Sequence, residues 1–384
     1  MSKIFLMPPK ILTGIGAIKE LSLHIKNNKS KALIVTDAIM TKIGNVAKLT
    51  RILDASKISY IIYDEVNSEP TDKIVEQGVV VFKQNACDFI IALGGGSPID
   101  AAKAIGVMAV NDGKISDYMK KIINTEIPYL VAIPTTAGTG SEVTQVTIIT
   151  DTENNIKMLL RGPEVIPKLA LVDPEFSLTT PPKVTVATGI DALCHAIEAY
   201  TSRCAQPLTD TFALSAIKRI YTNLEKVYKD SNDIEARFQM SLGALEPGIA
   251  FNNSSVTIVH GMSRPIGALF HVPHGVSNAI LLTKCLEFAI HGNTQRFADI
   301  AKVIGMYEPQ MTELEAAKRL VFGIDELCKV LNVPQIEELK IDKGEFYNQL
   351  DKMATDALAS GSPANTLRQP SKEDLIEIYK SLWQ

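Results

Sequence analysis

The first half of the chain alternates short apolar runs with amphipathic stretches. Six runs are predicted strands, and the first four are uninterrupted: residues 32–36, 60–63, 89–93, 129–133, 146–150 and 169–172. Because apolar residues in the first four do not alternate with polar ones, the pattern predicts parallel strands covered on both faces. The stretch Asp72–Asn85 has a helical period. Strand and helix patterns therefore follow one another as in βαβ units.

After Pro181-Pro182 the pattern changes to long helical stretches. The predicted helices are residues 191–201, 208–227, 234–245, 312–331 and 372–383. No convincing strand run occurs from Val184 onward, so the double proline is the best candidate boundary. The predicted fold is an α/β domain with a mostly parallel sheet, residues 1–181, followed by an all-α domain, residues 182–384.

Composition narrows the classes of partner and location. With 384 residues, 46% of them hydrophobic, two domains with sizeable cores are expected. A net charge of −4 argues against nucleic acid or an anionic membrane surface as the main partner. No run reaches the ~18 apolar residues of a membrane-spanning helix, and Pro8-Pro9 interrupts the short apolar run at the N-terminus. The 5 cysteines are scattered without a CxxC pair, which favours free thiols in a reducing cytoplasm.

A glycine-rich segment, Gly94–Asp100, follows one predicted strand and begins a helical stretch. Ser97 suits the N-cap, Pro98 the first helical position, and Asp100 the closing position of a capping box. Free N–H groups at such a helix start bind anions, and glycines let the backbone approach a ligand. We favour a pyrophosphate cradle over a simple tight turn. The segment is neither a Walker loop nor a GxGxxG fingerprint, because Ile99 stands where the third glycine would be.

Two further segments follow predicted strands in the same way. The polar loop Pro134–Ser141 places hydroxyl groups at the carboxyl edge of the predicted sheet, where α/β folds bind ligands. Asp37 follows the run 32–36, and its carboxylate there could accept hydrogen bonds from a ribose diol and repel a 2′-phosphate. An ordinary solvated loop aspartate fits that position about as well.

One carboxylate and three imidazoles form a candidate metal site in the helical half. Asp191 and His195 are four residues apart and share one face of a predicted helix. His260 and His274 are fourteen residues apart, in a segment whose glycine and proline predict a break. Each residue alone is more often structural. Together with the glycine-rich segment, the four favour a divalent transition metal that acts as a Lewis acid.

Several segments together resemble the iron-containing alcohol dehydrogenase family, also called group III. They are Gly94–Lys103, Pro134–Glu142, Thr188–Glu198, Ala250–Asn253 and Pro273–Gly275. They come in the family's order and span nearly the whole chain. The resemblance implies an N-terminal dinucleotide-binding domain, a C-terminal helical domain, and an active site in the cleft between them.

The resemblance also implies roles for individual residues. Asp191, His195, His260 and His274 match the family's metal ligands, and Phe251 matches a substrate-pocket position. Asp37 matches the acidic residue associated with NAD over NADP. The other implied cofactor contacts are Gly94, Gly95, Gly96, Ser97, Asp100, Thr135, Thr136, Thr139, Lys157 and Leu178.

The chain departs from the family pattern at two places. Many members carry a second histidine four residues after the third ligand, as a proton relay, and here Arg264 stands there. Arginine cannot exchange protons near neutral pH, so we expect His271 to be the substitute catalytic residue. Arg264 either binds an anionic group on the substrate or forms a structural pair. Glu69 stands where relatives often have Asn, which removes support for one nucleotide contact.

The predicted function is a metal-dependent, NAD(H)-linked alcohol dehydrogenase or aldehyde reductase. Its expected substrate is a small primary alcohol or aldehyde, including one that bears an anionic group. Fe²⁺ is the expected metal, and Zn²⁺ would accept the same ligands. Two alternatives stay open: a non-redox NAD and metal enzyme like dehydroquinate synthase, and an NAD- and metal-binding protein without turnover. We expect a cytoplasmic homo-oligomer, a dimer or larger, with no nucleic-acid or membrane partner.

Overall fold

The structure is a computed structural model of the chain, in which residues 2–25 and 29–383 are described. They divide into two compact units. The first unit is Phe5–Thr180. The second comprises residues 181–383, together with residues 2–4.

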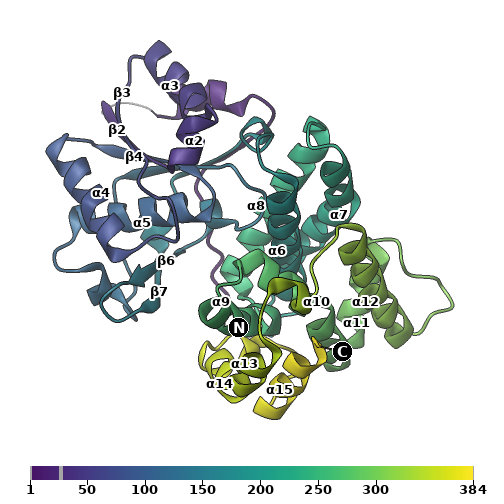
Figure 1. Cartoon of the computed structure of the whole chain (residues 1–384). Coiled ribbons are helices and arrows are strands. Elements are labelled where there is room, and N and C mark those ends of the chain that lie inside the picture. The colour runs from purple at the N-terminus through teal and green to yellow at the C-terminus, as the bar shows by residue number, and fades with distance from the viewer. Residues whose placement is uncertain (1, 26–28, 384) are drawn as a thin grey trace. The chain divides into compact units, whose positions relative to one another are not determined.

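The first unit is built on a six-stranded sheet in the order β1-β8-β5-β4-β2-β3. Figure 1 labels β2, β3 and β4 of this sheet. Its strands are β1 (Ile11–Thr13), β2 (Lys31–Val35), β3 (Ser59–Tyr63), β4 (Phe89–Gly94), β5 (Tyr129–Pro134) and β8 (Leu169–Val172). Every neighbouring pair is parallel. The predicted α/β class with a mostly parallel sheet is therefore confirmed.

Apolar layers cover both faces of this sheet. Leu33 and Ile90 belong to one buried cluster, and Ala32 and Ile91 belong to the other, so successive strand residues enter opposite layers. The first layer includes residues of α4 (Asp72–Gln84) and α5 (Gly96–Val110), and the second includes residues of α1 (Leu21–His24) and α3 (Asn45–Ala55). Burial on both faces is the reason that the strands appear as continuous apolar runs.

Two strands of the first unit were not predicted from the sequence. β1 has only three residues, too few for a pattern, and β7 (Ile156–Arg161) was missed. β6 (Val146–Asp151) is a strand as predicted, but it forms a separate antiparallel hairpin with β7. Buried and exposed residues alternate along β7, as they do in a sheet with one covered face.

The second unit is helical. Its helices are α6 (Pro182–Tyr200), α7 (Pro207–Lys229), α8 (Ile234–Ser254), α9 (Ile258–Phe270), α10 (His274–Ala289), α11 (Thr294–Val303), α12 (Glu313–Val330), α13 (Lys343–Asn348), α14 (Leu350–Ala359) and α15 (Lys372–Ser381). No strand occurs in this unit among the described residues. The predicted all-α second half is therefore confirmed.

Helix α6 begins at Pro182, well before the predicted start at Asp191. Its first two turns are rich in β-branched residues and contain Gly189, which weakens the helical pattern. The structure explains that glycine. A Cβ on Gly189 would lie 2.4 Å from Leu224 Cδ1 of α7, so a larger residue there would have to displace that side chain. Pro182 suits the first helical position because no N–H is needed there.

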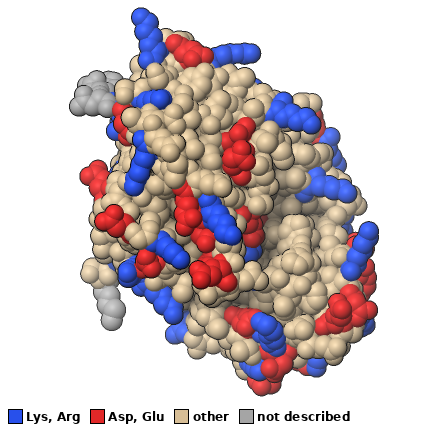
Figure 2. Space-filling model, turned by 60° about the vertical axis from the view of Figure 1, so that its left-hand side comes forward, with Lys and Arg blue, Asp and Glu red and all other residues tan. Residues whose placement is uncertain are grey.

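The surface offers no single charged patch on the face drawn in Figure 2, where Lys and Arg side chains are mixed with Asp and Glu. Across the described part of the chain, no helix combines the length and apolarity needed to cross a membrane. Cys204 is exposed, the other four cysteines are buried, and all five are free thiols.

Candidate metal centre and nucleotide-binding loops

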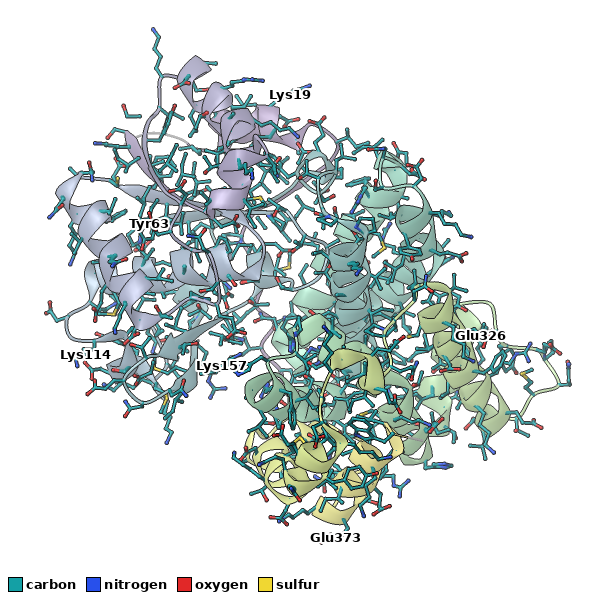
Figure 3. The ribbon with its side chains drawn as sticks, viewed as in Figure 1. Lys19, Tyr63, Lys114, Lys157, Glu326 and Glu373 are labelled. Atoms are coloured by element: carbon teal, nitrogen blue, oxygen red, sulfur yellow. The ribbon has the colours of Figure 1, made fainter. Side chains whose placement is uncertain are left out.

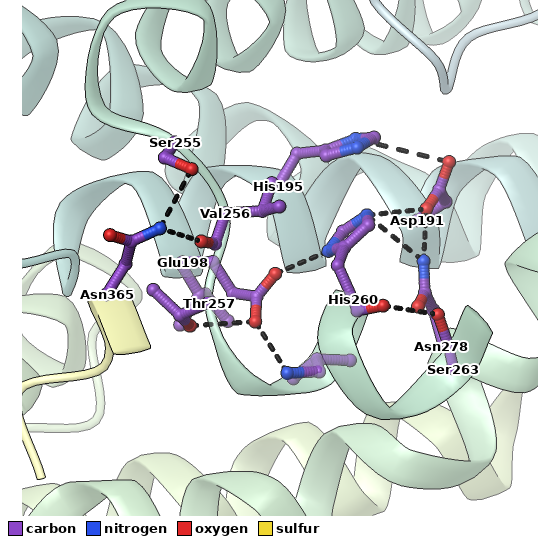
Figure 4. A network of polar contacts seen from close by, with 12 residues as sticks. Asp191, His195, Glu198, Ser255, Val256, Thr257, His260, Ser263, Asn278 and Asn365 are labelled. Carbon is purple, nitrogen blue, oxygen red and sulfur yellow. Dashed lines mark hydrogen bonds and ion pairs between the residues drawn. The ribbon is translucent and has the colours of Figure 1, made fainter. Parts of the chain in front are cut away.

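Three helices supply the candidate metal ligands, and Figure 4 shows Asp191, His195 and His260 among them. Asp191 and His195 lie one turn apart on α6, His260 lies in the first turn of α9, and His274 begins α10. His271 ends α9 in a left-handed conformation (φ 54°), which separates α9 from α10. The predicted break between His260 and His274 is therefore present.

The ligand atoms of this cluster converge. Asp191 Oδ1 lies 3.4 Å from His260 Nε2 and 3.6 Å from His274 Nε2, and Asp191 Oδ2 lies 4.0 Å from His195 Nδ1. Ligands that bond one metal at about 2.0–2.2 Å in a tetrahedral shell lie about 3.4 Å apart. One ligand atom from each of Asp191, His195 and His260 falls within 4.8 Å of the others. His274 is close to Asp191 but outside this group of three, with 47% of its side chain exposed.

Burial and neighbouring charges shift the pKa values of Asp191, His195 and His260 in different directions. Burial lowers the pKa of His195 to about 3. Burial also opposes charge on Asp191, but His195, His274 and His260 hold the pKa of Asp191 well below its usual range. At His260, burial is outweighed by the Glu198 and Asp191 carboxylates, which raise its pKa to about 9. The cluster therefore stabilises positive charge between two carboxylates.

Glu198 orients the His260 ring. The His260 Nδ1–H donates to Glu198 Oε2, and Glu198 Oε1 accepts hydrogen bonds from the Thr257 hydroxyl (2.8 Å) and the Val259 N–H (2.6 Å). The carboxylate is 1% exposed. With Nδ1 committed to Glu198, the Nε2 atom of the same ring points toward Asp191. This arrangement of carboxylate, imidazole and metal is typical of metalloproteins.

Asn278 provides the best test of whether a metal fits. Its Nδ2 lies 2.6 Å from Asp191 Oδ1 and 3.2 Å from Nε2 of both His260 and His274. An amide nitrogen carries two hydrogens, so at most two of these three contacts are hydrogen bonds that Asn278 donates. Among the described residues, buried His195 Nδ1 also has no hydrogen-bond partner. A buried imidazole that is neutral and unpartnered, beside the buried Asp191 carboxylate, fits a divalent cation.

Neither Glu198 nor Asn278 received a role from the sequence, although both lie at helical spacing from a predicted ligand. Glu198 follows Asp191 by seven residues on α6, and Asn278 follows His274 by four on α10. A search of the ligand-bearing helix faces for polar residues would have found both.

The predicted catalytic residues lie at different depths. Phe251 of α8 stacks on His195, with ring centroids 4.3 Å apart. Arg264 is partly buried on α9, and this burial lowers the pKa of its guanidinium. His271 is exposed at the end of α9. Of the three, the structure places Phe251 directly against a candidate metal ligand.

In the first unit, the predicted nucleotide segments gather at one sheet edge. Asp37, Gly94–Gly96 and Thr135–Thr139 follow β2, β4 and β5, which are parallel neighbours. The chain leaves β2 toward β3 on one side and leaves β4 toward β5 on the other. Ligands of open α/β sheets bind at such a switch point, at the carboxyl ends of the strands.

The glycine loop (Gly94–Gly96) and the threonine loop (Thr135–Thr139) face each other. A Cβ on Gly96 would lie 3.0 Å from Thr139 Cγ2, and one on Gly95 would lie 3.5 Å from Thr136 Oγ1. The Thr135 N–H donates to the Gly94 carbonyl (3.0 Å). Because glycine adds no side chain between the loops, a phosphate could approach the backbone there.

The predicted capping box is wrong. α5 begins at Gly96 and its N-cap is Gly95, without a side-chain hydrogen bond, so Ser97 lies inside the first turn. The Asp100 carboxylate instead accepts hydrogen bonds from Ser141 Oγ (2.6 Å) and the Ile148 N–H (3.0 Å). The tertiary contact with the segment after the threonine loop therefore outweighs the local cap. No side chain caps the N-terminus of α5, which suits an anion site.

Lys103 also binds the segment that follows the threonine loop, residues 141–146. Its fully buried ammonium donates to Ser141 Oγ (3.2 Å), Thr144 Oγ1 (3.0 Å) and the Val146 carbonyl (2.8 Å). Burial lowers the pKa of Lys103 to about 8 and raises the pKa of buried Glu142 to about 7. These groups fix the chain that follows the threonine loop.

The remaining predicted cofactor residues have mixed surroundings. Asp37 caps α2 (Ala38–Lys42) by accepting the Met40 N–H at 3.0 Å. Lys157, on the surface of β7 (Figure 3), pairs with Glu69 at 2.7 Å, and both side chains are at least half exposed. Leu178 is half-buried beyond β8. Glu69, which stands where relatives often have Asn, thus forms an ion pair with Lys157, the predicted cofactor lysine.

A buried cluster that suits a divalent metal and a sheet edge with paired polar loops are features of metal-dependent dinucleotide oxidoreductases. Residues 8–174 match the iron-containing alcohol dehydrogenase family, and residues 185–383 match its C-terminal part. The chain therefore belongs to the iron-containing alcohol dehydrogenase family, and it is an oxidoreductase of the alcohol dehydrogenase class.

Curated relatives and solved structures agree with this assignment. The chain is 35% identical to NAD-dependent methanol dehydrogenase of Bacillus methanolicus, covering 98% of this chain and 99% of the relative. It is 36% identical to lactaldehyde reductase of Escherichia coli strain K12, covering 96% and 97%. The crystal structure of a 1,3-propanediol oxidoreductase superposes with a TM-score of 0.96 at 34% identity over 100% of both chains.

The contact between Glu198 and His260 predicts an effect on metal affinity. Glu198→Gln should weaken metal binding by about 10–100-fold, because the neutral amide holds the ring less firmly and makes it less basic. Anaerobic competition titration with Fe²⁺ or Zn²⁺ measures this without any assay of turnover. Glu225→Gln, which alters an exposed carboxylate of α7, is the matched control. Equal affinity in wild type and Glu198→Gln would contradict the positioning role.

The pKa of Glu142 predicts a pH dependence of stability. Because folding raises this pKa from 4.5 to about 7, the folded chain holds a proton that the unfolded chain has lost between these pH values. The free energy of unfolding should therefore fall as the pH rises through this range, and Glu142→Gln should remove the fall. Urea unfolding of both proteins at about pH 5 and about pH 8 checks this. The free energy of unfolding of Glu142→Gln minus that of wild type should be larger at about pH 8 than at about pH 5. An equal difference at both pH values would refute the prediction.

Proposed function

We propose that the protein is a metal-dependent, NAD(H)-linked dehydrogenase of small primary alcohols that also reduces the corresponding aldehydes. The main support is that buried ligand atoms of Asp191, His195 and His260 lie close together, in a chain that belongs to this family. The relatives named methanol dehydrogenase and lactaldehyde reductase support a small substrate.

Asp191, His195, His260 and His274 are the proposed metal ligands, with Fe²⁺ as the metal and Zn²⁺ compatible with the same donors. When bound, the metal would supply Lewis-acid stabilisation of negative charge on the substrate oxygen. Asp191 contributes the anionic donor, and the surrounding imidazoles contribute neutral ones. Phe251, stacked on His195, shields that ring from water and forms one wall of the proposed substrate pocket.

The first unit is the proposed NAD-binding domain, and the second the proposed metal-binding domain. Gly94–Gly96, Ser97 and the N-terminus of α5 would bind the pyrophosphate. Thr135, Thr136 and Thr139 would line the opposite side, and Asp37 would accept hydrogen bonds from the ribose diol. NAD supplies the hydride chemistry, and the chain supplies position.

Three predicted cofactor residues have less direct support. Both oxygens of the Asp100 carboxylate bind Ser141 and the backbone of Ile148, so Asp100 would act by fixing the threonine loop. Lys157 must exchange its Glu69 partner for a cofactor group. Leu178 is proposed as an apolar contact.

Proton transfer needs a group other than Arg264, since a guanidinium stays protonated at neutral pH. His271 remains the proposed relay. It is exposed at the C-terminal end of α9, where a solvent-accessible imidazole could exchange protons.

Cellular location and assembly stay proposals. Free thiols at all five cysteines support a reducing compartment, for which we propose the cytoplasm. Light scattering after gel filtration would test the proposed homo-oligomer.

The comparisons do not favour the non-redox alternative, because the relatives named above are dehydrogenases and reductases. A protein without turnover is distinguished by assay. Oxidation of NADH by the Fe²⁺-loaded protein with a panel of short aldehydes should be observed. Its absence with every aldehyde would reject the proposed function.

His260→Ala tests the metal assignment. Loss of one imidazole opens the shell to water, so the variant should retain little metal and lose most of its activity. Elemental analysis of the purified variant measures the metal directly. Full metal content together with full activity would remove His260 from the proposed shell.

Asp37 should set the cofactor preference. Its charge should repel the 2′-phosphate of NADPH, so wild type should have a higher kcat/KM with NADH. Asp37→Asn removes the charge and keeps a residue that can cap α2, and it should narrow the preference by roughly five- to tenfold. Asp37→Gly should narrow the preference for NADH in the same way, although glycine caps α2 more weakly. A wild-type preference for NADPH would show that the assignment is wrong.

A further inference from the structure

One face of α9 runs from the metal cluster toward the surface. His260, Arg264 and Ala268 are spaced by one turn each, and they change in order from buried through partly buried to exposed. The other side of α9 packs inside the unit. There the Met262 carbonyl accepts the Tyr379 hydroxyl (2.7 Å), and a Cβ on Gly261 would lie 2.5 Å from Pro363. Arg264 therefore lies on the face that leads outward from His260.

The Arg264 guanidinium is unpaired within the described part of its unit. Among the described residues of its unit, no carboxylate lies within ion-pair distance and no acceptor binds its N–H groups. Glu198 is the one carboxylate whose charge acts on it, and both Glu198 oxygens are committed to His260, Thr257 and Val259. A structural ion pair, the second sequence-based hypothesis, is therefore absent from this unit.

A partly buried guanidinium without a partner is costly, and an anion that joins it offsets that cost. Its planar fork suits the two oxygens of a carboxylate or sulfonate. Residues one turn apart on a helix have Cβ atoms about 5–6 Å apart. An anionic group held by Arg264 would therefore be a few bonds from a substrate oxygen held beside His260.

We propose that Arg264 is the anion-binding residue of the substrate site, and that the protein acts on short aldehydes with a carboxylate or sulfonate at the other end. This inference rests on the proposed function, and it names its substrate class. Arg264 acts here as a specificity residue, separate from hydride and proton transfer.

The test compares two aldehydes of similar length on the Fe²⁺-loaded protein with NADH: 4-oxobutanoate, and its neutral ester methyl 4-oxobutanoate. Arg264→Met should lower kcat/KM for 4-oxobutanoate about 10- to 150-fold more than for the ester, the loss expected for a charge-assisted hydrogen bond. Arg264→Lys, which keeps the charge without the fork, should fall between. Arg319→Met, at an exposed site on α12, is the matched control and should leave the ratio unchanged.

A binding measurement complements the kinetics. Without cofactor, 4-hydroxybutanoate should raise the Tm of the metal-loaded wild type more than butane-1,4-diol does, and Arg264→Met should abolish the difference. If wild type reduces neither aldehyde, the proposed function fails. If wild type reduces the ester and Arg264→Met affects both aldehydes equally, the proposed function stands and the anion site is wrong.

Discussion

The second unit gathers one carboxylate and three imidazoles around a single amide side chain. Asp191 Oδ1 and the Nε2 atoms of His260 and His274 all lie within 3.2 Å of a single amide nitrogen, on Asn278. Among the described residues, buried His195 Nδ1 has no hydrogen-bond partner, and such an unsatisfied buried polar atom costs on the order of 1–3 kcal/mol. A cation resolves this conflict. The carboxylates raise the affinity of the cluster for positive charge, and a divalent metal satisfies the lone pairs directly.

Helix α6 converts this constraint into a rigid site. It carries Asp191, His195 and Glu198 on a segment that is buried through nearly its whole second half. This helix packs closely on α7, with Gly189 against the Leu224 side chain. Glu198 then holds α9 by accepting the Val259 N–H in its first turn and the Nδ1–H of His260. One carboxylate thereby sets both the position of a helix and the orientation of a proposed ligand on it.

The sequence predicted features that depend on local spacing. The continuous apolar runs gave the parallel strands, and the four-residue spacing of Asp191 and His195 placed both on one helix face. Contacts between distant segments were not predictable in this way. The bond from Glu198 to His260 joins α6 to α9, and the bond from Asp100 to Ser141 outweighed a local cap. In the β6–β7 hairpin, β6 was predicted and β7 was missed, because the alternating burial of β7 differs from the pattern of the main sheet.

X-ray absorption spectroscopy at the iron edge of the reconstituted protein tests the central claim most directly. The account predicts a first shell of nitrogen and oxygen only, with the outer-shell scattering of several imidazole rings, and loss of part of that imidazole signal in His260→Ala. A sulfur ligand in the first shell, or iron bound without imidazole scattering, would contradict the assignment of this cluster as the metal centre.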